Sequence, residues 1–390
     1  MAVSKTPFET PSTSPEERVR KASGRVASAP GTWVLIGENV DHFGGVTLVG
    51  TSSLRAAAAV SPRTDGVISI AARGPLGQEF SAQLPYGDEP ADGLARRWWG
   101  LVHTLVQRQV LSRDTSGMDI TVESDVPVGA GLGALYAADA AIALALAGGH
   151  DDVDTAPFRA RLAEICSHAV ATYSSLPVLR ARHSVALRGA EGVSVVDYAD
   201  GSLTQAPHPS RHGVRVFSVS QELGAPFTQS REVIAERRAF IDAACSNFGV
   251  SSLRQLPDAP SRAVQWVEAR RAAGDTNAPE PEAARRWVAF CESETLRSLA
   301  AAKALRSRRA NELFTLLNSP SEAHDLASPD ALVALARKRG AVAARPAAIG
   351  TSDAVIAFVP VQEADSFAAA MAREFEVVEV AAGEPARLEG

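Results

Sequence analysis

The 390-residue sequence has few of the features that mark secreted, metal-binding or membrane proteins. Its three cysteines, Cys166, Cys245 and Cys291, are far apart and lack metal-ligand spacing, which argues against a disulfide framework and favours a reducing compartment. The N-terminus has no apolar core of a signal peptide. The most apolar segment, residues 134–147, is too short to span a bilayer and contains Asp139.

Basic residues are outnumbered by acidic ones, 39 to 45, which gives a formal net charge of -6 and an isoelectric point near 5.8. A nucleic-acid-binding surface is normally basic, so this balance argues against such a partner. Hydrophobic residues make up 46% of the chain and charged residues 22%, which is ordinary for a globular protein. The length predicts two domains. We therefore expect a cytoplasmic protein that binds neither nucleic acid nor a membrane.

One polar stretch, Ser28–Gly45, follows the pattern of a buried strand that ends in a turn. The apolar run 33–36 stops at a glycine, and Glu38, Asn39 and Asp41 follow directly. Polar side chains at the end of a buried strand are well placed to bind a small ligand, and two carboxylates with an amide suit the hydroxyl groups of a sugar. An ordinary turn with a solvated acidic loop would also explain the pattern, because Gly, Asp and Asn need no functional reason there.

A glycine-rich turn follows the predicted strand Met118–Ser124. Its residues 128–133 read V-G-A-G-L-G and precede an alanine-rich helix that extends to about Ala147. Gly129, Gly131 and Leu132 could cradle a phosphate, because free N–H groups and the helix dipole both favour an anion. Tight strand-to-helix packing explains the glycines equally well, and no P-loop lysine follows.

The remaining pattern mixes strands and helices without strict alternation, which predicts an α+β fold. The sequence predicts three regions: a disordered N-terminus at 1–13, a first domain at 14–212 and a second at 213–390. Predicted strands include 26–36, 46–49, 54–60, 67–72, 193–197, 214–220 and 355–360. Predicted helices include 92–111, 158–173, 176–188, 231–248, 283–310 and 331–339, and a Pro- and Ala-rich connection covers 257–281.

Two of these motifs resemble the galactokinases. The stretch A-P-G-T-W-V-L-I-G-E-N-V-D-H-F-G-G is similar to their signature A-P-G-R-V-N-L-I-G-E-H-T-D-Y-N-G-G, and the glycine turn is similar to P-x-G-A-G-L-S-S-S-A-S of the wider GHMP kinase superfamily. The resemblance implies a two-domain GHMP-kinase-like architecture with a cleft between the N- and C-terminal domains. It also implies ATP and Mg²⁺ as partners, and it implies that Glu38, Asn39 and Asp41 bind the sugar. From the residues themselves we predict no cofactor and no metal ligand.

The chain departs from this pattern where the family's phosphoryl-transfer residues stand. By ungapped counting, the resemblance assigns Arg182 to the family's catalytic Asp and Thr32 to its Arg. Gly133, Ala134 and Leu135 replace the three serines, one of which binds magnesium, and Val170 replaces a supporting Glu. Residues 348–353 stand where the family has a second glycine loop. An arginine cannot act as a base near neutral pH, and a hard cation needs oxygen ligands.

Three hypotheses follow from this pattern. The first is a galactokinase-like pseudokinase that binds a sugar or regulates a protein partner. The second is an active galactokinase or related small-molecule kinase in which Asp139, Asp353 or Glu38 supplies the missing carboxylate. The third is a structural subunit in which Arg182 closes the old site by pairing with Glu38 or Asp41.

Two further groups of polar residues have weaker interpretations. His168, His183 and Asp197 could form a hydrolase set, although no G-x-S-x-G motif accompanies them. Glu292 and Glu294 are interpreted as a solvated helix face.

Overall fold

A computed structural model describes residues 8, 10–224, 230–320 and 325–390. The prediction of disorder at 1–13 falls mostly outside the described residues. The first part of the chain contains helices α1 (Pro15–Val19), α2 (Gly93–Gln107), α3 (Ala134–Ala147), α4 (Ala156–Tyr173) and α5 (Arg180–Arg188), and strands β1 (Arg25–Ile36), β2 (Val46–Pro62), β3 (Val67–Arg73), β4 (Glu79–Pro85), β5 (Met118–Ser124), β6 (Val193–Asp197) and β7 (Leu203–Ala206). The later part contains β8 (Val214–Ser220), α6 (Arg231–Phe248), α7 (Ala259–Ala272), α8 (Pro281–Arg306), α9 (Ala310–Asn318), α10 (Asp330–Lys338), β9 (Ala343–Pro346), β10 (Val355–Pro360), α11 (Ala364–Met371), β11 (Glu376–Glu379) and β12 (Arg387–Glu389).

Two sheets organise these elements. The larger has the order β12-β1-β2-β5-β3-β4, with β6 paired to β2 and β7 paired to β6. Its pairs are antiparallel except β3 with β5. The smaller is antiparallel throughout, in the order β11-β8-β10-β9. The two sheets and their helices confirm the predicted α+β fold, whereas the boundary near residue 213 stays a prediction.

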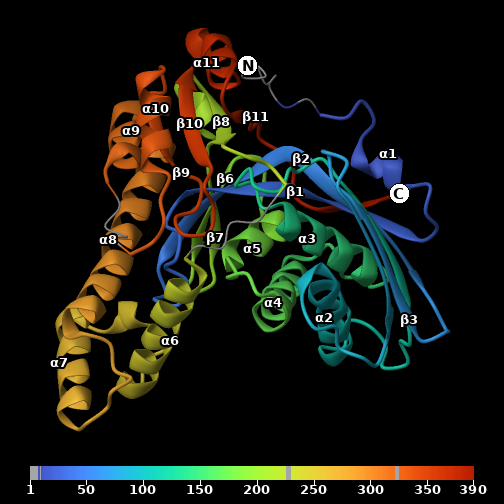
Figure 1. Ribbon diagram of the computed structural model, residues 1–390, viewed down its shortest axis with the longest axis horizontal. Coiled ribbons are helices and arrows are strands. Elements are labelled where there is room, and N and C mark those ends of the chain that lie inside the picture. The colour runs from blue at the N-terminus through green and yellow to red at the C-terminus, as the bar shows by residue number, and fades with distance from the viewer. Residues whose placement is uncertain (1–7, 9, 225–229, 321–324) are drawn as a thin grey trace.

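Helices α2 to α5 lie together beneath the larger sheet (Figure 1). Helix α3 packs against β1 and β2 and is buried along most of its length. Its sequence is almost entirely alanine and leucine, and a helix that is apolar all round is stable only when it is enclosed. Gly133 is the N-cap residue of this helix and has a φ of +65°. The glycine turn therefore leads directly into the helix N-terminus.

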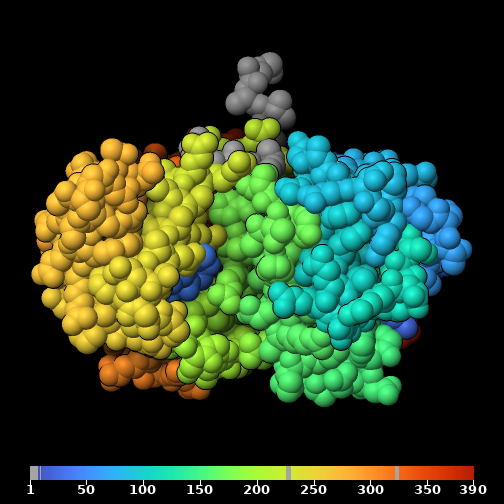
Figure 2. Space-filling model, turned by 90° about the horizontal axis from the view of Figure 1, so that it is seen from below, coloured from blue at the N-terminus to red at the C-terminus, as the bar shows by residue number. Residues whose placement is uncertain are grey.

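The α6–α8 helices extend from the smaller sheet as a separate lobe, and α8 spans from the end of this lobe back toward α9 (Figure 1). Figure 2 shows this lobe, in yellow and orange, on the opposite side of the molecule from α2 in cyan. In that view a small dark-blue patch of the N-terminal part is visible beside the lobe. Among the described residues, no helix is long and apolar enough to cross a membrane.

Several predicted elements differ from the structure. The two strands expected at 46–49 and 54–60 are one strand, β2, because it pairs with β6 at its start and with β5 at its end. The connection expected at 257–281 contains α7, whose Ala263 and Val267 are buried in the lobe. The helix expected from Leu176 begins only at Arg180.

Candidate active site

The turn after β1 is held against helix α8 of the second half of the chain. Gly37 adopts a φ of +91°, and a Cβ there would lie 2.5 Å from Ser298 Oγ. A Cβ on Gly45 would lie 2.4 Å from Thr295 Oγ1. Only glycine permits this approach, because any side chain would push α8 away. The turn that carries Glu38 is therefore part of the contact between the two halves.

Glu38 is buried in that contact. Its carboxylate accepts hydrogen bonds from Arg345 Nη2 at 3.0 and 3.1 Å, and its side chain is 1% exposed. The same Arg345 Nη2 lies 3.4 Å from Glu294 Oε1, and Glu294 also pairs with Arg297 at 2.7 Å. The interpretation of Glu294 as part of a solvated helix face was wrong, because its side chain is 2% exposed; Glu292 is exposed as expected.

Asn39 and Asp41 also contact the second half of the chain. Asn39 Nδ2 donates to the Ile349 carbonyl at 2.9 Å, while its buried Oδ1 has no hydrogen-bond partner among the described residues. Asp41 accepts from Arg238 Nη2 at 3.3 Å, and its side chain is 4% exposed. Each of the two carboxylates thus faces an arginine from the second half of the chain. That these three residues bind a sugar stays a prediction.

The glycine turn lines a cavity of about 110 Å³. Thr351 and Ser352, from the segment that aligns with the family's second glycine loop, also line it. Gly131 has a φ of +68°, and a Cβ there would lie 2.4 Å from the Ala347 Cβ. The two loop segments are therefore packed against each other around one cavity. A nucleotide-binding role for Gly129, Gly131 and Leu132 stays a prediction.

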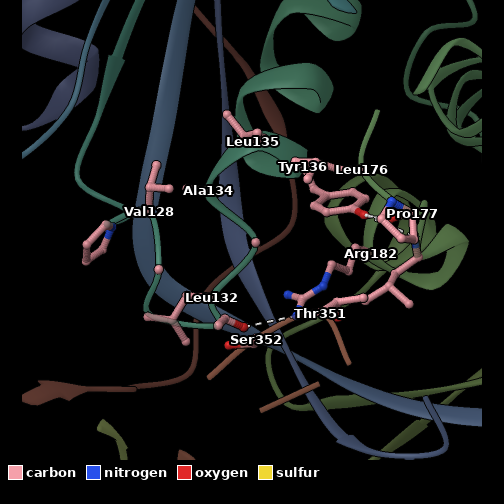
Figure 3. A pocket seen from close by; sticks show the side chains of 15 residues that line it. Val128, Leu132, Ala134, Leu135, Tyr136, Leu176, Pro177, Arg182, Thr351 and Ser352 are labelled. Carbon is pink, nitrogen blue, oxygen red and sulfur yellow. Dashed lines mark hydrogen bonds between the residues drawn. The ribbon is translucent and has the colours of Figure 1, made fainter. Parts of the chain in front are cut away.

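Arg182 reaches from α5 to this loop (Figure 3). Its guanidinium donates to the carbonyls of Thr32 and Gly131, the latter at 3.0 Å, and its side chain lies 5.7 Å from the Tyr136 ring centre. Only 3% of the residue is exposed. Burial lowers the pKa of Arg182, opposed by Tyr136 and Glu38. Among the described residues it forms no ion pair, so the expected pairing with Glu38 or Asp41 was wrong: two carbonyls take that place.

A buried polar network lies beneath Tyr136. Asp139 accepts from Arg97 Nε at 3.0 Å and from Trp98 Nε1 at 3.0 Å, and it lies 3.1 Å from His183 Nε2. The other ring nitrogen of His183 lies 3.1 Å from Ser167 Oγ. Burial raises the pKa of Asp139, but Arg97 and His183 outweigh it and leave the pKa at about 2. For His183, in contrast, burial lowers the pKa, because it disfavours the charged imidazolium.

The hydrolase set suggested by the sequence does not assemble. His168 is exposed, and Asp197 pairs with Arg254 at 2.6 Å in another region. The sequence offered no signal for Ser167, Arg345 or Arg238, because their partners are far away along the chain. Within the described ranges, no group of three or more His, Cys, Asp or Glu residues could hold a metal ion.

Comparison with known proteins supports the relationship suggested by the motifs. The family model described as the galactokinase galactose-binding signature matches residues 16–62. The galactokinase of Streptomyces coelicolor is 27% identical over 298 residues, which cover 73% of this chain and 74% of the relative.

Solved structures show the same fold. The galactokinase of Lactococcus lactis, determined in complex with galactose, superimposes with a TM-score of 0.73 at 16% identity, covering 93% of this chain and 94% of that one. The mevalonate kinase of Methanococcus jannaschii gives a TM-score of 0.54 at 12% identity, covering 95% and 100%. The chain therefore shares the fold of these galactokinase and mevalonate kinase structures, and its sequence is similar to that of a galactokinase over about three quarters of its length.

Proposed function

We propose that this galactokinase-like protein binds a hexose without phosphorylating it. The observation that carries the proposal is the position of Arg182, which is buried and donates to the carbonyls of Thr32 and Gly131. By the motif comparison this is the position of the family's catalytic Asp. Phosphoryl transfer needs a group there that orients or deprotonates the sugar hydroxyl, and an arginine guanidinium, which stays protonated near neutral pH, does neither.

The cavity beside Arg182 also does not fit Mg²⁺. Its described lining includes the hydroxyls of Tyr136, Thr351 and Ser352 but no carboxylate. Proteins usually bind Mg²⁺ through one or two carboxylates together with the substrate phosphates. The glycine turn can still offer N–H groups to an anion, but the residues around it supply no ligand set for the metal that phosphoryl transfer requires.

The sugar would bind at the turn after β1. Glu38 and Asp41 keep the carboxylates that suit sugar hydroxyls, and the family model for galactose binding covers both residues. Arg345 and Arg238 occupy these carboxylates in the structure, so a bound hexose has to share or displace those contacts. We expect weak binding for that reason, and a hexose related to galactose as the ligand class.

An active kinase is the second candidate, and Asp353 favours it. Of the three carboxylates that could replace the missing Asp, Asp139 is held by Arg97 and Glu38 by Arg345. Asp353 has no such ion pair among the described residues, follows the cavity-lining Ser352, and has a pKa raised by burial. A carboxyl with a raised pKa is a candidate general base.

Calorimetry and a phosphorylation assay separate the two candidates. The proposal predicts that galactose binds at millimolar concentration, that Asp41→Asn weakens this binding at least fivefold, and that no sugar phosphate forms with Mg-ATP. Val361→Ala, a change at an exposed site away from the turn, is the matched control. Sugar phosphate production that Asp353→Asn abolishes would replace the proposal with the active kinase.

A regulatory form of the proposal adds a protein partner in the cytoplasm that responds to the sugar-bound state. Such a partner would give a function to sugar binding that is not followed by phosphorylation. Affinity capture from the source cytoplasm with and without galactose tests it, and a partner retained equally in both conditions argues against sugar sensing.

A further inference from the structure

One side of helix α8 is exposed to solvent. The helix lies along the border of the molecule, from the α6–α8 lobe to α9 (Figure 1). Its other side is buried against α7, α9 and the first half of the chain. On the exposed side, Leu296 is 63% exposed and Leu299 is 41% exposed. A helix face that carries large apolar side chains is normally packed against a partner.

The exposed side of α8 has the residue spacing of a coiled-coil seam. Successive positions are alternately three and four residues apart, which keeps them in line along a helix that packs against another helix. Ser293 and Ala300 lie beside this line and are small, so a second helix can approach closely. The line consists of Ala289, Glu292, Leu296, Leu299, Lys303 and Arg306.

The charges on this line select the partner helix and its direction. Glu292 and Lys303 are exposed and form no ion pair among the described residues. Two parallel copies of α8 would set Glu292 against Glu292 and Lys303 against Lys303, which repel. In an antiparallel pair Leu296 faces Leu299 of the second copy, and Glu292 faces Lys303 of the second copy. Both contacts occur twice, because a two-fold axis passes between the leucines. The face is therefore complementary to itself in the reversed direction.

We propose that this face of α8 binds a second copy of the same chain in an antiparallel, two-fold symmetric dimer. Four leucines form the apolar centre of the contact, and a Glu292–Lys303 ion pair lies at each end. Arg306 does not compete for Glu292, because β7 holds it through Thr204 Oγ1 at 2.7 Å. One helix from each copy buries less surface than a standard protein interface, so the dimer is weak and depends on protein concentration.

The dimer leaves the turn after β1 free. That turn approaches the buried side of α8, where Gly37 lies next to Ser298 and Gly45 lies next to Thr295. The leucines of the proposed contact lie on the exposed side of the same helix. The dimer is therefore independent of the proposed hexose site, and either proposal can fail without the other.

Sedimentation equilibrium of the whole chain between about 1 μM and 1 mM tests the dimer, because this range covers the dissociation constants of weak complexes. We expect a monomer at the lower limit and a reversible dimer at the upper limit. Leu296→Asp places a carboxylate against each opposing leucine and should weaken association by about tenfold or more. Leu76→Asp is the matched control, a change at a leucine that is 46% exposed in the turn between β3 and β4, and should leave association unchanged.

Charge reversal identifies the face and its direction. Glu292→Lys and Lys303→Glu each bring like charges together at both ends of the contact and should weaken the dimer about fivefold. The double variant restores opposite charges and should recover the association of the wild type. Both positions are exposed, and circular dichroism checks that each variant is folded. A wild type that stays monomeric at about 1 mM overturns the proposal. A dimer that these substitutions do not affect, or that the double variant does not restore, overturns it as well.

Discussion

Arg345 Nη2 lies 3.0 Å from Glu38 Oε1 and thereby joins a strand of the smaller sheet to the turn after β1. Both side chains are nearly inaccessible, at 4% and 1% exposure. An ion pair that is withdrawn from water is costly to break from one side, because the remaining charge keeps its desolvation penalty. This contact should therefore matter for stability as well as for ligand binding.

Glu38→Ala tests the stability role. We expect the free energy of unfolding to fall by about 3 kcal/mol, the lower end of the range for breaking a buried pair, since Glu294 still faces Arg345 at 3.4 Å. Urea unfolding measures the change. Glu282→Ala removes a glutamate that is 66% exposed and should change stability by less than about 0.5 kcal/mol. Equal effects of the two substitutions would show that the Glu38–Arg345 pair contributes nothing.

Arg182→Met tests whether the arginine secures the glycine turn. Two carbonyls lose their donor, so we expect a loss of about 1–3 kcal/mol in unfolding free energy. Arg180→Met, on the same helix at 38% exposure, is the control. Arg182→Asp should lose the same donors and yet form no sugar phosphate with Mg-ATP, because the cavity still lacks a carboxylate pair for the metal. Phosphorylation by that single variant would contradict the assignment.

The buried His208 side chain should make the free energy of unfolding depend on pH. Burial lowers its pKa from 6.5 to about 4, so below pH 6.5 the unfolded chain takes up a proton that the folded chain refuses. Its contribution is therefore fully present above pH 6.5 and is lost as the pH falls from 6.5 to 4, by about 3 kcal/mol at most.

The substitution His208→Asn isolates this contribution. Asparagine can still accept the hydrogen bond from the Ser210 N–H, which His208 Nδ1 accepts at 3.2 Å, but it does not titrate. Unfolding in urea at pH 7 and pH 4.5 should show a stability loss that is about 2–3 kcal/mol smaller in the variant. The same pH dependence in both proteins would rule out His208 as its source.

Ser167, His183 and Asp139 share the residue types of a serine hydrolase, but we expect no reactivity. Ser167 is 4% exposed and Arg97 neutralises Asp139, so a substrate carbonyl cannot reach the hydroxyl. A fluorophosphonate probe should leave the native protein unlabelled while it labels a trypsin control. Labelling that disappears in Ser167→Ala would show that the network opens. Ser167→Ala itself should cost about 1 kcal/mol.

The sequence predicted best those features that depend on neighbouring residues. The strand that stops before Gly37 follows from its local apolar run. The glycine turn before α3 follows from its glycines, which adopt positive φ angles in the structure. Helix α7 was missed because the prolines and alanines of the segment 257–281 suggested a loop, whereas burial in the lobe stabilises the helix. Strand β4 was not predicted, although its apolar residues alternate: Phe80, Ala82 and Leu84 are half-buried, and the residues between them are exposed.

The partners of the candidate site could not be predicted in this way. Glu38 and Arg345 are 307 positions apart, and Asp41 and Arg238 are 197 apart. Nothing in the sequence around Arg345 or Glu294 distinguishes a buried ion pair from a solvated one. Only the packing of α8 and β9 against the turn after β1 decides which charges lose contact with water. Motif comparison located Arg182, but its hydrogen bonds to two carbonyls depend on where α5 lies relative to β1.

Strand β12 gives the larger sheet an unusual order of assembly. Its residues pair with Val26, Ala27 and Ser28 of β1, although they are synthesised more than 350 positions later. Until they emerge, this border of β1 keeps unpaired N–H and C=O groups, which invite pairing with another chain. On the ribosome the larger sheet is thus complete only after residues 387–389 have been made. Its exposed border during that interval is a natural place for a chaperone to bind or for aggregation to begin.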